Sequence, residues 1–363
     1  MFEDFDKISK DAWEAKVLAD LKGKPLSDLV WEVEHELKVL PFYHADDFEK
    51  APSTLVGQSP STSWEVGESF TVSDVKQSNK QMLTALNGGV NALELILLRT
   101  PSTADLELLF SEVNLDFISS HFILPADSDL VNFINHWLNF LKHRNIDPTQ
   151  VNGSFVKTGA PNTEELAEAI RFCNKALPEF KLIGISTKGN LSPSDDLATL
   201  IQQAYQYLAD LSDAGISPEI IASGIQLKVS TGKSFFVEIA KIRALKLLWG
   251  NLLKAFHVAP TTPVSISAAF ATGALEQDVN KNMITAATMA MSAIMGGAHR
   301  LFVSPGDMDK EQFSRRIARN VQHLLKMESF LDKVDDPGAG SYYIEKLTRS
   351  FGEIAWEKVK ASV

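Results

Sequence analysis

The sequence has 363 residues, of which 45% are hydrophobic and 22% charged, and its formal net charge is -11 at pH 7. This is the composition of a globular protein, and the chain is long enough for one large core or two small ones. The negative charge argues against nucleic acids and anionic membrane surfaces as partners, because both repel an acidic protein.

The cysteine count and the first residues indicate a compartment. The single cysteine, Cys173, rules out an internal disulfide and suits a reducing cytosol. It lies in the helical pattern EELAEAIRFCNKAL, so we expect it in the core rather than as a nucleophile. The acidic start, MFEDFDKISKDAWEAK, has no features of a signal or transit peptide, and no run approaches the ~18 apolar residues of a membrane span. We therefore predict a soluble, cytoplasmic protein.

Residues 1–65 are predicted to form an arm outside the main domain. A helix is expected in SKDAWEAKVLADLKG, and the following stretch from Pro41 to Ser63 is rich in proline and serine. That stretch has too little hydrophobic periodicity to fold alone. We expect the arm to wrap either the following domain or a partner.

Between about Phe70 and Val334, short apolar runs alternate with longer segments of helical periodicity. Strands are predicted at Phe70–Asp74, Ala92–Leu98, Leu115–Phe122, Val151–Lys157, Lys181–Thr187, Ile225–Thr231, Val264–Phe270 and Arg300–Pro305. The clearest helices are predicted at Asp129–Arg144, in TEELAEAIRFCNKAL and at Ser234–Phe256. Eight strand–helix pairs predict an α/β fold, a (β/α)8 TIM barrel over residues 66–335. A doubly wound open sheet is the alternative, but the glycine-rich phosphate loop that would favour it is absent after the first strand.

The chain after the barrel, residues 336–363, begins with DPGAGSYY and is predicted to form a turn and a final amphipathic helix.

Alternation within the strands predicts a polar barrel interior. Ile225, Leu227 and Val229 are expected to face the helices, which leaves Gln226, Lys228 and Ser230 inward. The same reasoning places other small or polar side chains inward: Thr71, Ser73, Glu94, Asn152, Ser154, Gly184, Ser186, Ser265, Ser267 and Ser304. Barrel interiors are normally filled by Val, Ile and Leu, so a polar lining needs partners in the protein, a ligand or water. If the side chains alternate in this way, Glu94 and Lys228 can pair inside the barrel.

The candidate site residues are therefore barrel-lining or ligand-contacting positions rather than a recognisable catalytic set. They are Ser73, Glu94, His121, Asn152, Ser186, Asn190, Gln226, Lys228 and Ser267. His121 is included because chemistry in such barrels lies at the carboxyl ends of the strands. No metal site is predicted, because the chain has one cysteine and no two histidines at positions i and i+4. Neither a G-x-S-x-G turn nor a phosphate loop occurs.

The last third of the chain carries a long, specific pattern. SFFVEIAKIRALKLLW, QDVNKNMITAATMAMSAIMGGAHRL and above all RRIARNVQHLLKMESFLDKVDDPGAGSYYIEKLT resemble the methylmalonyl-CoA mutase family of adenosylcobalamin-dependent isomerases. WEVGESF and ALNGGVNALEL resemble the first strands of that family's barrel, so the resemblance covers essentially the whole chain. It implies a barrel in which a CoA thioester threads along an axis lined by small hydrophilic side chains, with cobalamin across the carboxyl-terminal mouth.

The resemblance also implies catalytic residues that this sequence lacks. Catalytic members carry a histidine in a loop similar to I-S-G-Y-H after the fifth strand, and that position falls on Gly189. The arginine and tyrosine after their first barrel tryptophan fall on Gly67 and Ser69. No histidine here has an aspartate two positions before it, so the D-x-H-x-x-G motif is absent and no cobalamin-binding domain is expected. No catalytic residue is therefore predicted in this chain.

Two hypotheses follow from the resemblance. In the first, the chain is a small, non-catalytic (beta) subunit whose barrel and arm stabilise a large catalytic subunit in a pseudo-symmetric heterodimer. Adenosylcobalamin and the interconversion of methylmalonyl-CoA and succinyl-CoA then belong to the complex, and this chain alone binds no cofactor. In the second, the chain is an acyl-CoA isomerase barrel that is active with a cobalamin domain supplied in trans.

Three further alternatives stay open from the sequence. The chain can form a homodimer instead of a heterodimer. Its barrel can bind an acyl-CoA without performing chemistry on it. Finally, Glu94, Gln226 and Lys228 can fill the barrel axis themselves, in which case no thioester enters.

Overall fold

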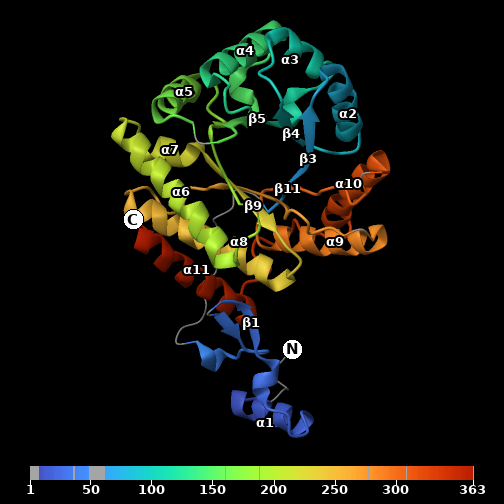
Figure 1. The fold of residues 1–363 in the computed structure, drawn as a ribbon, viewed down its shortest axis with the longest axis vertical. Coiled ribbons are helices and arrows are strands. Elements are labelled where there is room, and N and C mark those ends of the chain that lie inside the picture. Colours follow the sequence, from blue (N-terminus) through green and yellow to red (C-terminus); the bar gives the residue numbers. More distant parts are fainter. Residues whose placement is uncertain are drawn as a thin grey trace.

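The parallel strands of the computed structural model curve into a nearly closed barrel with helices on its outside (Figure 1). The structure describes residues 8–362 except 36, 49–61, 160, 188, 277 and 308. The barrel strands are β3 Glu65–Val72, β4 Ala92–Leu97, β5 Ser119–Leu124, β6 Asn152–Lys157, β7 Phe180–Lys181, β8 Ile183–Ser186, β9 Ile225–Thr231, β10 Ser265–Phe270 and β11 Arg300–Phe302. Their order is β7-β6-β5-β4-β3-β11-β10-β9-β8.

Strands β7 and β8 are two parts of one barrel strand, because only Leu182 separates them. The first part pairs with β6 and the second with β9, so the ring closes through this divided strand. Counted this way, eight strands form the ring, and the predicted (β/α)8 barrel is confirmed.

Most helices on the outside of the barrel begin at a residue whose side chain caps the first turn. The outer helices are α2 Val75–Asn87, α3 Thr103–Leu109, α4 Leu130–His143, α5 Thr163–Ala176, α6 Pro193–Asp213, α7 Pro218–Gly224, α8 Phe235–Ala255, α9 Val279–Met295, α10 Glu311–Met327 and α11 Tyr342–Ser362. The side chains of Asp74, Ser102 and Asp129 accept hydrogen bonds from the first turns of α2, α3 and α4, although α8 and α10 have no such side-chain cap. Helices α2 to α5 cover one side of the ring and α6 to α11 the other (Figure 1).

The core between the strands and the helices is rich in aromatic rings. Trp137 of α4 lies with its ring centroid 5.0 Å from that of Phe122 on β5. Phe133 of the same helix meets Phe155 of β6 edge-on at 5.3 Å. All four side chains are fully buried, so this contact fixes α4 against the sheet through the hydrophobic effect.

Some predicted strand limits were wrong. The first strand begins at Glu65 rather than Phe70, and the last ends at Phe302 rather than Pro305. The third starts at Ser119, because the preceding residues Leu115–Phe117 form a 3-10 turn that the side chain of Asn114 caps. The start of β3 was missed because its glutamates make the sequence look polar. These glutamates are accommodated in the strand because each pairs with an arginine far along the chain.

Helix α10 replaces strand pairing along one edge of β3. Strand β11 pairs with β3 only from Glu65 to Gly67. Beyond that point, Gln322 Nε2 donates to the carbonyl of Gly67 at 3.3 Å, and Arg315 donates to that of Ser69 at 3.1 Å. Side chains of α10 thus satisfy backbone carbonyls that a neighbouring strand would otherwise take.

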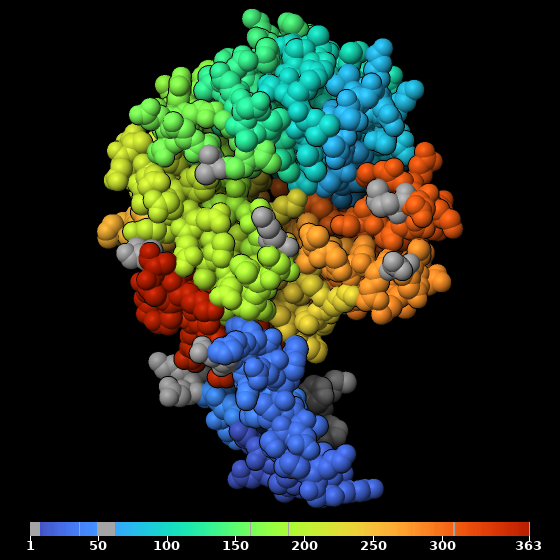
Figure 2. Space-filling view, viewed as in Figure 1, coloured from blue at the N-terminus to red at the C-terminus, as the bar shows by residue number. Residues whose placement is uncertain are grey.

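The amino-terminal arm projects from the barrel beside the start of α11 (Figures 1 and 2). It contains α1 Lys10–Asp20 and an antiparallel hairpin of β1 Trp31–Glu34 and β2 Leu37–Val39, with 3-10 turns at Leu26–Leu29 and Ala45–Asp47. Glu34 docks the hairpin by accepting a hydrogen bond from Ser194 N at 3.0 Å, at the start of α6. Much of the proline- and serine-rich stretch, residues 49–61, lies outside the described residues.

A buried ionic cluster joins the carboxyl-terminal residues to the barrel helices. Arg243 of α8 donates to both carboxylate oxygens of Asp336 at 2.9 Å and to Glu345 of α11 at 2.8 Å. It also donates to Thr348 Oγ1 at 2.9 Å. Helix α11 is therefore packed into the body of the protein, against α8 and α6. In the described part of the chain, no helix combines the length and apolar character needed to cross a membrane.

Candidate functional site

An ion pair spans the barrel axis. Lys228 Nζ of β9 contacts both carboxylate oxygens of Glu94 on β4, with 2.8 Å to Oε2. Ser69 Oγ donates to the same oxygen at 2.8 Å, and the Lys228 ammonium lies 4.9 Å from the ring centroid of Phe302. Because β4 and β9 are four places apart in a ring of eight, this pair bridges opposite walls of the bore.

His121 fills the next part of the interior with hydrogen bonds. Its Nδ1 lies 2.9 Å from Ser154 Oγ and its Nε2 3.0 Å from Ser119 Oγ, so both ring nitrogens have partners. Burial holds the pKa of His121 well below its ordinary value, and the positive charges of Arg300 and Lys228 lower it further. The imidazole is therefore neutral at pH 7, and neither nitrogen is free to serve as a base.

The other predicted site residues do not join this cluster. Ser267 is buried on β10 and donates to the carbonyl of Leu227 at 3.4 Å, while Gln226 is half-buried at the start of β9. Four lie exposed at strand ends or in loops: Ser73, Asn152, Ser186 and Asn190. Ser304 lies beyond the end of β11 and lines a gap between α9 and α10. Their role as ligand contacts stays a prediction.

Sequence reasoning missed one interior pair. Arg300 at the start of β11 forms an ion pair with Glu65 at the start of β3, at 2.6 Å. Both positions lie on the inward faces of their strands, in register with each other. Arg300 is the first residue of its predicted strand, but Glu65 lies before the predicted start of the first strand at Phe70, so alternation could not have found both members of this pair.

Two positions at which catalytic relatives are expected to carry side chains have no room for one. A Cβ on Gly67 would lie 2.6 Å from the ring of Phe302 and 2.8 Å from the carbonyl oxygen of Leu301. A Cβ on Gly189 would lie 2.7 Å from the Cβ atoms of Ala271 and Ser230. Real Cβ contacts are not that short, so the neighbouring groups have closed over both sites.

Replacing Gly189 by alanine is expected to cost more stability than replacing Gly215. Both glycines have a positive φ, +70° and +81°, so each alanine costs about 1–2 kcal/mol of backbone strain. Only Gly189 also faces close neighbours, and overpacking should add about 1–3 kcal/mol, whereas nothing lies within 4 Å of a Cβ on Gly215. Chemical denaturation of both variants measures the difference, and equal losses would show that the space beside Gly189 is open.

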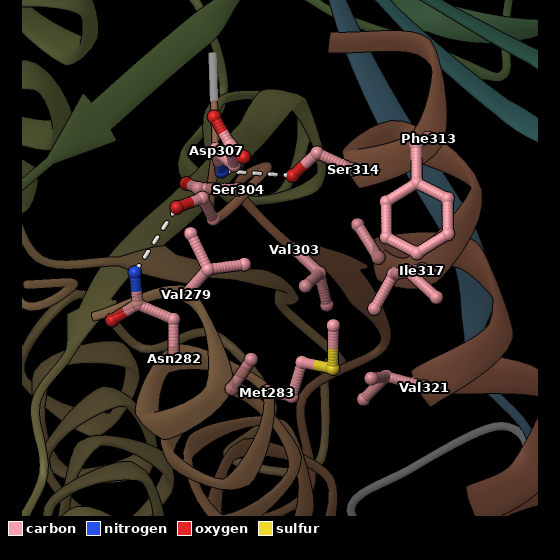
Figure 3. Close-up of a pocket in the computed structure, with 13 residues that line it drawn as sticks. Val279, Asn282, Met283, Val303, Ser304, Asp307, Phe313, Ser314, Ile317 and Val321 are labelled. Atoms are coloured by element: carbon pink, nitrogen blue, oxygen red, sulfur yellow. Dashed lines mark hydrogen bonds between the residues drawn. The ribbon is translucent and has the colours of Figure 1, made fainter. Parts of the chain in front are cut away.

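The gap between α9 and α10 is a packing defect rather than a ligand site (Figure 3). It holds about 20 Å³, room for little more than one water molecule, and its walls are mostly apolar. Met283 and Ile317 face each other across it. At its rim, Asp307 N donates to Ser314 Oγ at 2.9 Å and Asn282 donates to the carbonyl of Gly306 at 3.0 Å.

Neither a metal centre nor a reactive thiol is evident in the part of the chain that the structure describes. No three His, Cys, Asp or Glu side chains there are grouped to hold a metal ion. Cys173 is buried in α5, and burial raises the pKa of its thiol to about 12. A thiol in that state is not a nucleophile at neutral pH.

Comparison with known proteins gives a consistent relationship. The family model described as methylmalonyl-CoA mutase matches residues 98–361. The methylmalonyl-CoA mutase small subunit of Porphyromonas gingivalis is 32% identical to this chain, over 98% of the chain and 63% of that protein. The small subunit from Streptomyces virginiae is 27% identical, over 82% and 51%, and the large subunit from that organism is 23% identical, over 97% and 56%. This chain thus spans 51% to 63% of the length of these relatives.

Proposed function

This chain belongs to the methylmalonyl-CoA mutase family, and on that premise we propose that it is a small-subunit-like, non-catalytic partner of a cobalamin-dependent acyl-CoA isomerase. Its partner is a large mutase subunit in a cytoplasmic heterodimer, and the complex interconverts methylmalonyl-CoA and succinyl-CoA. The observation that carries the proposal is the ion pair of Glu94 and Lys228 across the bore.

A filled bore is incompatible with a thioester on the barrel axis. To enter, a pantetheine chain would have to part Lys228 from the largely buried carboxylate of Glu94 and remove the hydrogen bond from Ser69. The pantetheine chain of an acyl-CoA offers no cation to replace the ammonium, so Glu94 would be left as an unpaired buried charge. The closed positions Gly67 and Gly189 add to this argument, because neither can carry a group that contacts a substrate.

The histidine inside the barrel does not fit adenosylcobalamin as a cofactor of this chain. A histidine that ligates cobalt or contacts a substrate needs a free ring nitrogen, and both nitrogens of His121 are taken by Ser119 and Ser154. Gly189 presents no side chain towards the mouth. We therefore derive no step of catalysis through cobalamin here, and assign the cofactor to the large subunit.

The arm supplies a surface for the partner. None of the residues of α1 is buried, and the arm exposes Leu18, Leu29 and Trp31 to 49%, 41% and 45%. Figure 2 shows this segment standing away from the barrel. Exposed apolar side chains on a projecting segment are typical of a protein interface, since burying them in a partner gains free energy.

Co-purification with the large mutase subunit of the same organism tests this proposal. We expect a stable complex, and at least tenfold weaker association for the double variant Leu18→Asp, Leu29→Asp. Leu108→Asp is the matched control, because Leu108 is 45% exposed on α3 at the far end of the molecule from α1 (Figure 1). A chain that does not associate, or a control that weakens binding as much as the arm variant, would contradict the proposal.

The retained polar lining favours a second candidate, an acyl-CoA isomerase barrel that works with a cobalamin domain supplied in trans. Ser69, Glu94 and Lys228 are polar where barrels usually carry aliphatic side chains. Turnover of a branched acyl-CoA by this chain together with a separate cobalamin domain would support this candidate and exclude the first.

A further inference from the structure

A second pocket lies at the carboxyl-terminal ends of strands β8 to β10. It has room for about 200 Å³ and lies between the loops that lead into α6 and α8. Trp31 of the arm and Leu191 contribute apolar surface, and Asp196, Glu238 and Lys241 contribute charge. This pocket is separate from the ion pair in the bore, and the mouth of such a barrel is where ligands usually bind.

Three of the charged residues that line this pocket are almost completely buried, whereas Lys233 at its rim is exposed. Asp196, Glu238 and Lys241 are 2%, 6% and 4% exposed. Lys241 Nζ donates to the carbonyl of Ser230 at 2.7 Å and forms an ion pair with Glu238 at 2.6 Å. It lies 4.0 Å from Asp196 Oδ2, beyond hydrogen-bond distance. Asp196 Oδ1 has no hydrogen-bond partner among the residues that the structure describes.

The charges around the pocket do not neutralise Asp196. Among the described buried side chains here, two carboxylates face one ammonium, which leaves this group of three with one negative charge in excess. Lys233 at the rim is held by Glu276 at 2.5 Å, and Asp195 is held by Lys358 at 2.6 Å. A buried carboxylate without a donor is costly, so Asp196 needs a donor that the described residues do not supply.

We propose that this pocket binds a small organic ammonium ion whose nitrogen donates to Asp196 Oδ1. A charge-assisted hydrogen bond would satisfy the unpaired oxygen, and the added charge would balance the excess. The exposed indole of Trp31 offers a π face to the cation, and Leu191 offers apolar contact for its carbon frame. This inference goes beyond the proposed function and does not depend on it, because it concerns the chain alone and a site outside the bore.

The protonation of Asp196 gives the site a pH dependence. Burial raises the pKa of Asp196 to about 6; Lys241 opposes this shift, and Glu238 and Asp195 add to it. An ammonium ion binds only the deprotonated carboxylate well. Affinity should therefore be highest above about pH 7 and fall as the pH is lowered through 6, where the empty site takes up a proton.

Titration of the full chain with n-propylammonium, followed by the indole NMR signal of Trp31, tests the proposal. We expect a saturable shift at pH 7.5, with affinity reduced at least tenfold in Asp196→Asn. Asp213→Asn, an exposed change on the same helix, should leave the affinity unchanged. Asp196→Asn should keep or raise the melting temperature, because it removes a buried carboxylate whose pKa is raised, so a loss of binding would not reflect unfolding.

Three outcomes would overturn the proposal. The first is the absence of a saturable shift, which would mean that an ordered water molecule satisfies Asp196. The second is equal affinity in the wild type and in Asp196→Asn. The third is binding of propionate, the anion of matched size, in preference to n-propylammonium, which would assign the pocket to anions at the start of α8.

Discussion

Replacing Arg243 by methionine is expected to lower the free energy of unfolding by about 3–5 kcal/mol, among the largest losses from one side chain in this protein. Arg243 is 1% exposed and makes four hydrogen bonds, to Asp336, Glu345 and Thr348. Methionine fills much of the same volume but leaves two buried carboxylates without their cation. The cost is therefore the stranded charge rather than a cavity.

The control for this prediction is Arg349→Met on α11. The side chain of Arg349 is 63% exposed and pairs with Glu353 one helical turn away. Exposed pairs of this kind contribute about 0.3–0.5 kcal/mol, so the control should unfold close to the wild type. Urea denaturation measures both variants. Equal midpoints for the two variants would show that the buried cluster does not hold α11 in place.

Breaking the ion pair across the bore is expected to give the second large effect. Lys228→Met leaves the carboxylate of Glu94, whose side chain is 8% exposed, without its counter-ion. We expect a loss of about 2–4 kcal/mol, in the lower part of this range because the Lys228 side chain is 30% exposed and water reaches the site. Urea denaturation is the measurement.

The double variant Glu94→Met, Lys228→Met separates the stranded charge from the packing. With both charges gone, most of the lost stability should return, because a buried pair and an apolar pair of similar volume are often close in energy. If the stability loss of the double variant equals the sum of the losses of Glu94→Met and Lys228→Met, each measured alone, the pairing seen in the structure is contradicted.

Much of the barrel could be predicted because its signals are local. Strand β9 lies at Ile225–Thr231 as predicted, since apolar and polar residues alternate strictly there. Helix α8 was predicted to within one residue at each end from its apolar character. Strand β3 was found only in part, because Glu68 is neutralised by Arg315 and Arg319. Those arginines are about 250 positions after Glu68 in the chain, so no local sequence pattern indicates that Glu68 has such a partner.

In the candidate site, too, local features could be predicted from the sequence, whereas features that depend on packing between segments could not. Alternation placed Glu94 and Lys228 on inward faces, and in the structure the two side chains meet. The closure of Gly67 by Phe302 and of Gly189 by Ala271 depends on how neighbouring strands pack, which one strand's sequence does not contain. Asp196 and its pocket were not predicted for the same reason, since four separate segments build that site.

Calorimetric titration of the purified chain with methylmalonyl-CoA is the most direct test of whether this barrel is non-catalytic. With Glu94 and Lys228 closing the bore, we predict no saturable heat of binding even at millimolar thioester. Saturable binding with micromolar affinity would contradict this, because the thioester would then have opened the bore that the ion pair is proposed to close.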